Sequence, residues 1–280
     1  MTKYALSIGV CLLLLFSACK KNLVPPVSDL EAKQILDVAY GSADQQKFDV
    51  YLPANRTAAT KVIVFLHGGS WRDEDKSQYT SLFTYFVDKG FAVINMNYRL
   101  AKDNSDKHPA QMEDIRSALD LVLARRNEYV ISDKIGLTGN SAGGHLALLY
   151  AYGFDIDERV KAVAALSAPT DFVQAANSGN TAAITTINYF LGKSFDEDQV
   201  LWVNASPYFR ATAASVPTIL FVGGKDDIVY PIQSENLKTR LTDLGVMNQL
   251  IVYPDEGHAW IGTNLTDTQQ KIVDWFTVNM

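Results

Sequence analysis

The sequence predicts one α/β domain with a mostly parallel central sheet and helices on both faces. Short apolar runs alternate with amphipathic stretches along the chain, as in β-α-β units. Apolar residues make up 48% of the 280, which is enough for one large hydrophobic core. No internal repeat or low-complexity segment interrupts this order.

The strands are expected where apolar runs of five to seven residues are bounded by turn residues. They are residues 35–40, 48–52, 61–66, 91–96, 134–138, 160–166, 218–222 and 249–253. Residues 41–44 (Gly-Ser-Ala-Asp) form the turn between the first two.

Four helices are expected between and after these strands. Residues 109–126 have a proline in the first turn and apolar residues at helical spacing. An alanine- and leucine-rich helix follows Ser141, residues 232–244 form a helix that Gly245 ends, and residues 268–278 form the last helix.

One connection is longer than a simple crossover requires. About fifty residues, 167–216, separate two predicted strands, and a loop of that length is usually a lid or an insertion. Its aromatic residues include Phe172, Tyr189, Phe190 and Trp202. We expect most of them to pack this lid insertion onto the domain.

Residues 1–18 predict an export signal rather than part of the fold. Lys3 gives a positive start, and the apolar run 4–16 is too short to span a bilayer. Ser17 and Ala18 before Cys19 resemble a bacterial lipoprotein signal, which implies cleavage before Cys19 and its acylation; a plain secretory signal is the alternative. Residues 19–34 would then tether residues 35–280 to a membrane of the cell envelope.

Charge and residue types exclude several partners. The formal net charge is −6 and no basic stripe is present, which argues against nucleic-acid binding. No spacing of His, Asp or Glu resembles a metal site, and no phosphate-binding loop precedes a helix, so we expect no metal and no cofactor. The sequence does not indicate an oligomeric state.

Ser141 is the candidate nucleophile. It lies in Gly139-Asn140-Ser141-Ala142-Gly143, between a predicted strand and a predicted helix. A serine at such a sharp turn exposes its hydroxyl, and small neighbours let the backbone bend. A serine hydroxyl needs a base to take its proton, and the base needs a carboxylate to orient it.

The base is expected among four histidines. His258 follows the last strand, so it lies at the edge of the sheet where functional groups gather. His145 lies on the helix that follows Ser141 and cannot turn back to the hydroxyl, while His67 and His108 come before it in the chain.

The carboxylate is expected at Asp226, just after a strand, with Asp171 as the alternative. Adjacent turn residues point in different directions, and Asp227 is expected to support the turn before Pro231.

Backbone amides are expected to stabilise an oxyanion. The amide of Ala142 follows the nucleophile, and those of Gly69 and Ser70 lie in a glycine turn after an earlier strand. Trp71 and Trp260 are candidate walls of the substrate pocket, and a core position is the alternative for Trp71.

Several short motifs occur in one order along the chain. They are His67-Gly68-Gly69-Ser70-Trp71, Asn97-Tyr98-Arg99-Leu100, His108-Pro109-Ala110-Gln111, Gly139 to His145, Gly224-Lys225-Asp226 and Gly257-His258. Together they resemble the α/β-hydrolases of the carboxylesterase and lipase group, related to hormone-sensitive lipase and to bacterial acetylxylan and feruloyl esterases. The resemblance covers about residues 35–280 and implies the α/β-hydrolase fold with a Ser141, Asp226, His258 triad.

The resemblance implies a serine hydrolase that acts on carboxylic esters through an acyl-enzyme. Ser70 stands where the lipase-like branch has a third glycine; this variant resembles esterases of plant-cell-wall carbohydrate and arylformamidases, so short-chain or carbohydrate-linked esters are expected. One alternative is an arylformamidase, or another amidase or peptidase, with the same triad. A non-catalytic binding protein on this scaffold is the other.

Overall fold

The computed structural model describes residues 29–280. The predicted signal 1–18, Cys19 and the first part of the tether, 19–28, lie outside the described residues. The first strand begins at Lys33, two residues before the predicted start of the domain.

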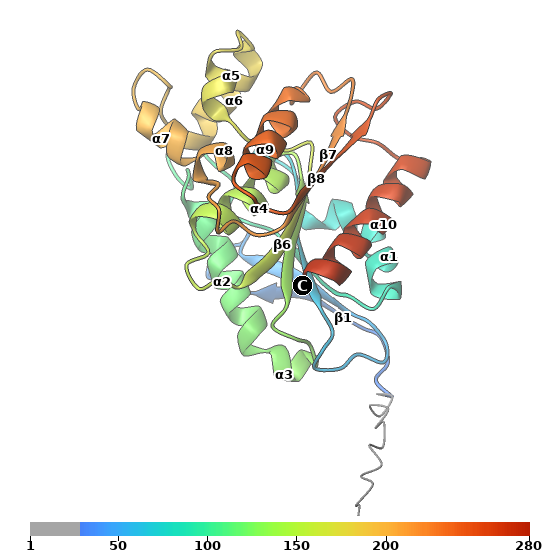
Figure 1. The fold of residues 1–280 in the computed structure, drawn as a ribbon. Coiled ribbons are helices and arrows are strands. Elements are labelled where there is room, and N and C mark those ends of the chain that lie inside the picture. Colours follow the sequence, from blue (N-terminus) through green and yellow to red (C-terminus); the bar gives the residue numbers. More distant parts are fainter. Residues whose placement is uncertain (1–28) are drawn as a thin grey trace, which may run out of the picture.

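The described residues form one eight-stranded sheet in the order β1-β2-β4-β3-β5-β6-β7-β8 (Figure 1). Its strands are β1 (Lys33–Ala39), β2 (Lys47–Leu52), β3 (Val62–Leu66), β4 (Ala92–Met96), β5 (Ile135–Asn140), β6 (Val160–Leu166), β7 (Thr218–Gly223) and β8 (Asn248–Tyr253). Each predicted strand is confirmed, with ends that differ by at most two residues.

The sheet is parallel except at one edge. Strand β2 runs antiparallel to both β1 and β4, and all the other neighbouring pairs are parallel. The chain order reverses between β3 and β5, where Leu66 pairs with Gly139. In open α/β sheets, ligands bind beyond the carboxyl ends of the strands at such a reversal.

Helices cover both faces of the sheet, as the sequence predicts (Figure 1). On one face lie α2 (Ala110–Ala124), α3 (Arg126–Tyr129), α4 (Ala142–Gly153) and α9 (Ile232–Asp243). On the other lie the 3₁₀ helix η1 (Lys76–Leu82), α1 (Phe83–Asp88) and α10 (Gly262–Asn279).

Each face has its own buried apolar cluster. Strand β3 contributes to both, because successive side chains point to opposite faces. Val62, Val64 and Leu66 face the helices α2, α4 and α9, whereas Ile63 and Phe65 face α1 and α10. Buried on both sides, β3 is apolar throughout, as expected of a central parallel strand.

Two helical regions differ from the sequence prediction. The segment 76–88 forms η1 and α1, although no helix is predicted there. Lys76 is the one buried residue of η1, and α1 is too short for its apolar residues to show a helical period. Helix α10 begins at Gly262, six residues before its predicted start. Within residues 29–280 no helix combines the length and the apolar content needed to cross a bilayer.

The predicted insertion between β6 and β7 is helical. It contains α5 (Phe172–Ala176), α6 (Thr181–Leu191), α7 (Gln199–Asn204) and α8 (Pro207–Arg210). These helices lie together at one end of the molecule, beside α9 (Figure 1). Phe172, Phe190 and Trp202 are fully buried, so they pack the insertion onto the domain as predicted.

Candidate active site

Ser141 lies at the turn between β5 and α4. Its backbone has φ 51° and ψ −122°, a conformation that residues with a side chain seldom adopt. The amide of Ser141 donates to the carbonyl of Leu166 on the neighbouring strand, over 2.7 Å. This contact fixes the turn against β6 and leaves the hydroxyl free to point away from the sheet.

The glycine after Ala142 lets α4 pass close to β3. A Cβ atom at Gly143 would lie 2.1 Å from the carbonyl oxygen of Leu66 and 2.3 Å from that of His67. No side chain fits there, so the last glycine of the pentapeptide is required by packing. The same approach brings the start of α4 beside the turn that follows β3.

Three side chains from distant parts of the chain meet at this turn. The Oγ atom of Ser141 lies 2.9 Å from Nε2 of His258, and Nδ1 of His258 lies 2.8 Å from Oδ2 of Asp226. His258 comes from the loop after β8, and Asp226 from the loop after β7. The structure therefore brings the predicted nucleophile, base and carboxylate into one hydrogen-bonded row.

The Asp226 carboxylate is buried and held from its other side. Its Oδ1 atom accepts hydrogen bonds from the amides of Ile228, at 3.0 Å, and Val229, at 2.9 Å. With Oδ1 occupied by two donors, Oδ2 is directed at His258. The carboxylate therefore fixes Nδ1 of His258 as the protonated nitrogen and leaves Nε2 to accept the proton of Ser141.

The alternative carboxylate has another role. Asp171 caps the N-terminus of α5, where it accepts a hydrogen bond from the amide of Gln174 at 2.9 Å. Asp227 lines the same cavity as Ser141. Among residues 29–280 the carboxylate that hydrogen-bonds to His258 is that of Asp226.

The turn after β3 presents unpaired amides beside Ser141. Gly69, Ser70 and Trp71 have φ of 86°, 54° and 61°, so the backbone stays left-handed for three residues. Within residues 29–280 the amides of Ser70 and Trp71 have no acceptor. Ala142 starts α4, where the first N–H groups lack an intrahelical partner.

Buried side chains hold this turn from below. The hydroxyl of Tyr98 donates to the carbonyl oxygens of His67 and Gly68, each at 2.9 Å, and its ring stacks on that of His67. Nδ1 of His67 also donates to the carbonyl of Gly68. His67 thus supports the turn, and the contacts of Tyr98 explain part of the Asn97-Tyr98-Arg99-Leu100 motif.

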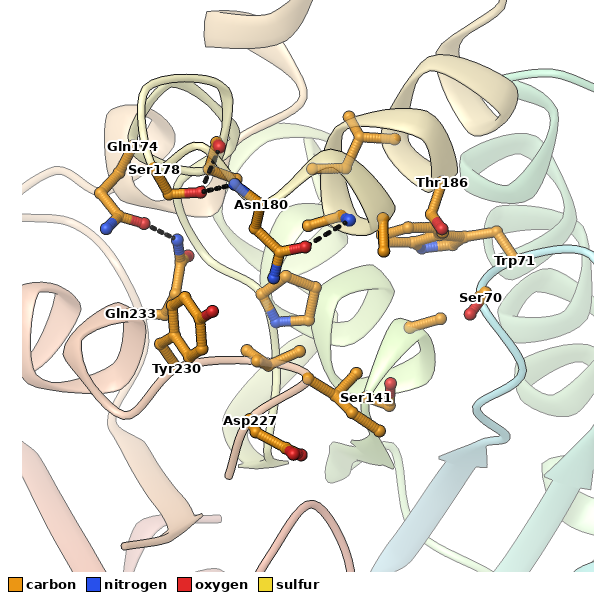
Figure 2. A pocket seen from close by; sticks show the side chains of 18 residues that line it. Ser70, Trp71, Ser141, Gln174, Ser178, Asn180, Thr186, Asp227, Tyr230 and Gln233 are labelled. Carbon is orange, nitrogen blue, oxygen red and sulfur yellow. Dashed lines mark hydrogen bonds between the residues drawn. The ribbon is translucent and has the colours of Figure 1, made fainter. Parts of the chain in front are cut away.

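A cavity of about 220 Å³ opens beside Ser141 (Figure 2). Figure 2 shows Ser70 and Trp71 on one side, and Tyr230 and Gln233 on the opposite side. Small and apolar residues of α5 and α6 form much of the wall: Ala175, Ala182, Ala183 and Ile187. Gln174, Ser178 and Asn180 place polar atoms at its far end.

Trp71 is both a pocket wall and a buried residue. It lines the cavity although only 3% of its surface is exposed. Gly69 does not line the cavity itself, whereas Ser70 and Ala142 do.

Trp260 is not found where the sequence interpretation placed it. It packs in the apolar cluster under α10, where its ring lies 5.1 Å from that of Tyr253 and its Nε1 donates to Oγ1 of Thr268. The reason is that α10 begins at Gly262, which draws Trp260 toward the face of the sheet. Trp260 is therefore a core residue beside the His258 loop.

The remaining cavity residues were not predicted. Gln174 and Asn180 come from the insertion, Tyr230 from the turn before α9, and Gln233 from the first turn of α9. The length of the insertion was the only signal in the sequence, and it points to no individual side chain.

Three of the four histidines are shielded from water: His67 and His145 are fully buried, and His108 is partly buried. Burial lowers the pKa of His67 and His108 to about 4, and that of His145 to about 3. In the unfolded chain these rings take up protons near pH 6.5, whereas in the folded protein they do not. Above pH 6.5 these rings are neutral in both states and do not lower the free energy of unfolding. As the pH falls from 6.5 toward 4, only the unfolded chain takes up protons, so the free energy of unfolding decreases.

We expect unfolding at pH 5 to take up almost one proton per buried histidine. The free energy of unfolding should then fall by about 4 kcal/mol per pH unit between pH 6 and 5. Urea denaturation at several pH values measures this slope. A free energy that stays constant from pH 7 to 5 would contradict the burial of these rings.

Within residues 29–280 no group of three or more His, Cys, Asp or Glu side chains could hold a metal ion. The site instead offers a hydroxyl, an imidazole oriented by a carboxylate, and unpaired amides next to a small cavity. This set of groups suits acyl transfer through a covalent intermediate.

Known proteins resemble the chain in sequence and in fold. A family model described as BD-FAE matches residues 48–241. The kynurenine formamidase of Danio rerio is 32% identical over 41% of this chain and 38% of its own length. Esterase LipQ of Mycobacterium tuberculosis is 27% identical over 82% of this chain and 58% of its own.

The chain thus spans between about a third and three fifths of these relatives. Among solved structures, a truncated carbohydrate esterase from gut microbiota has a TM-score of 0.77 at 23% identity, covering 90% of this chain and 99% of that one. The α/β-hydrolase fold is therefore confirmed.

Proposed function

The chain belongs to the BD-FAE family, and from that membership and the site geometry we propose that it is a serine hydrolase of carboxylic esters. The observation that carries the proposal is the row of two hydrogen bonds from Ser141 through His258 to Asp226. In this row Nε2 of His258 is placed to accept the hydroxyl proton.

The reaction proceeds in two halves. Nε2 of His258 takes the proton of Ser141 while Oγ attacks the ester carbonyl carbon. His258 then returns the proton to the leaving alcohol as the carbon–oxygen bond breaks, which leaves an acyl-enzyme. Water, deprotonated by His258, then attacks the acyl carbon. The bond between this carbon and Oγ breaks as His258 returns the proton to Oγ, and the carboxylic acid leaves.

The oxyanion of each tetrahedral intermediate is stabilised by backbone amides. Among residues 29–280 no acceptor is found for the amides of Ala142 and Ser70, and both residues line the cavity. Gly69 allows the turn, since a Cβ atom there would lie 2.2 Å from the carbonyl oxygen of Asp73. The amide of Gly69 is the third proposed donor to the oxyanion.

The cavity supports a short acyl group. Its volume of about 220 Å³ lies below the ~300–1,000 Å³ usual for small-molecule sites. We therefore expect an acyl chain of eight or more carbons to fit this cavity poorly. The name of the similar gut carbohydrate esterase supports an alcohol part that belongs to a carbohydrate.

A formyl amide is the second candidate substrate. The similarity to kynurenine formamidases favours it, because the same triad can cleave an amide when its acyl group is small.

The proposal of a lipid-anchored protein at the cell envelope is supported by the sequence of residues 1–19.

The test is a substrate series with the purified protein. We expect kcat/KM on p-nitrophenyl acetate and butyrate to exceed that on the octanoate by roughly 100-fold, because the longer chain does not fit the cavity. Acetylated xylan, feruloylated oligosaccharide and N-formylkynurenine distinguish the natural classes.

A fluorophosphonate should label Ser141 in the same preparation. A protein that hydrolyses none of these substrates and resists the label would be a binding protein, which contradicts the proposal. Faster cleavage of N-formylkynurenine than of any ester would favour the amidase instead.

A further inference from the structure

His145 lies one helical turn after Ser141 and uses both ring nitrogens. It is completely buried in α4. Its Nδ1 lies 3.1 Å from Nε1 of Trp71, and its Nε2 lies 2.8 Å from the carbonyl oxygen of Ala205. The ring therefore joins the turn after β3 to the segment between α7 and α8.

These contacts fix the tautomer of His145. The Ala205 carbonyl can only accept a hydrogen bond, so Nε2 carries the proton. Indole Nε1–H can only donate, so Nδ1 is the acceptor. Burial, which lowers the pKa of His145 to about 3, keeps the ring in this neutral form.

Trp71 transmits this contact to the amides at the cavity. It directly follows Ser70, and both residues border the space beside Ser141. Its indole stacks on Phe190 of α6, with ring centres 4.5 Å apart, and meets Phe172 of α5 edge to face. His145 in turn stacks on Phe172, at 4.7 Å.

These aromatic contacts position the Trp71 ring, but they do not give its Nε1–H group a hydrogen-bond acceptor. Among the described residues that partner is His145. The backbone of Trp71 is left-handed, with φ 61°, a conformation that costs free energy unless other contacts maintain it.

We infer that His145 is a positioning residue: through its hydrogen bond to Trp71 it holds the turn 69–71, and with it the amides of Gly69 and Ser70, where the oxyanion forms. The inference rests on the proposed function. His145 touches neither substrate nor Ser141 Oγ and exchanges no proton in the reaction; its effect is exerted through the backbone of the turn.

Three variants and a matched control test this role. His145→Leu removes both hydrogen bonds, and Trp71→Phe removes only the indole donor. His145→Gln keeps an acceptor and a donor in the side chain. Tyr152→Phe is the control, because it removes one partly buried hydrogen bond, to Oγ1 of Thr218, from the other end of α4.

We expect these substitutions to change kcat rather than KM. His145→Leu and Trp71→Phe should each lower kcat on p-nitrophenyl acetate by roughly 10- to 100-fold with little change in KM, since displaced oxyanion donors act mainly on the transition state. The double variant should lose little more than either single one, because both break the same contact. His145→Gln should recover most of kcat, and Tyr152→Phe should lower the melting temperature alone.

A second readout does not depend on activity. The chain has four tryptophans, so the indole Nε1–H resonance of Trp71 can be assigned by substitution. It should shift in His145→Leu and return toward the wild-type position in His145→Gln. Histidine nitrogen shifts should show His145 protonated at Nε2.

Two results would overturn the inference: an unchanged Trp71 resonance in His145→Leu, or a kcat within twofold of wild type in both Trp71→Phe and His145→Leu. If His145→Leu does not fold, Trp71→Phe and the tautomer of His145 decide the question. A wild-type protein that hydrolyses no substrate contradicts the proposed function alone, because the resonances still report the contact.

Discussion

Ser141→Ala is expected to lower kcat on p-nitrophenyl acetate by roughly 10⁴- to 10⁶-fold, the largest effect of any single change in this protein. The variant keeps the turn and the cavity but has no atom to form the acyl-enzyme. Residual turnover would come from the unpaired amides and from water activated by His258.

The fold of this variant should be unchanged. The only side-chain hydrogen bond that Ser141 makes among residues 29–280 is the one to His258, so alanine removes no structural contact. Stopped assays with high enzyme concentration, together with thermal unfolding, measure both properties. Ser117→Ala on α2 is the control for the substitution itself. Turnover within tenfold of wild type would mean that another group is the nucleophile.

Asp226→Asn is expected to lower kcat by about 10⁴-fold near pH 7. The amides of Ile228 and Val229 donate to one carboxylate oxygen, so the asparagine must place its carbonyl oxygen there. Its NH₂ group then faces Nδ1 of His258, which becomes an acceptor. The proton of His258 moves to Nε2, and the ring can no longer take the proton of Ser141.

The matched control is Asp255→Asn, on the loop that leads to His258. Its carboxylate is 91% exposed and pairs with Lys225, so the loss of its charge should change kcat by less than about twofold. Histidine nitrogen shifts of the Asp226→Asn protein should show the changed tautomer. If Asp226→Asn stays as active as Asp255→Asn, then His258 is oriented by something else.

The sequence predicts the strands well because each is a short apolar run between turn residues. Val62 to Leu66 shows no period at all, and that lack of alternation is itself typical of a central parallel strand. Short helices are harder to predict. Helix α1 spans six residues, Phe83–Asp88, fewer than two turns, so no apolar period can be recognised.

The site is predictable to the extent that strand ends define it. Ser141, Asp226 and His258 each follow a strand, and the carboxyl ends of parallel strands lie at one edge. Trp260 shows the limit: it is two residues from His258, yet the next helix turns it into the core. The wall formed by α5 and α6 depends on tertiary packing, and no local pattern reveals it.

His145 shows a further limit of inference from sequence. Its position on the helix that follows Ser141 excludes it as the base. The structure agrees, since Nε2 of His145 faces the carbonyl oxygen of Ala205. Its partner Trp71 is 74 residues away, and no spacing rule connects a turn tryptophan with a helix histidine.

The backbone conformation of Ser141 costs stability at the position of the proposed nucleophile. At φ 51° a residue with a Cβ atom costs about 1–3 kcal/mol that a glycine would not. Selection for stability alone would thus favour glycine over the proposed nucleophile at this position. The rest of the domain, above all the packing of β3, β5 and α4, must therefore supply enough stabilising free energy to offset this cost.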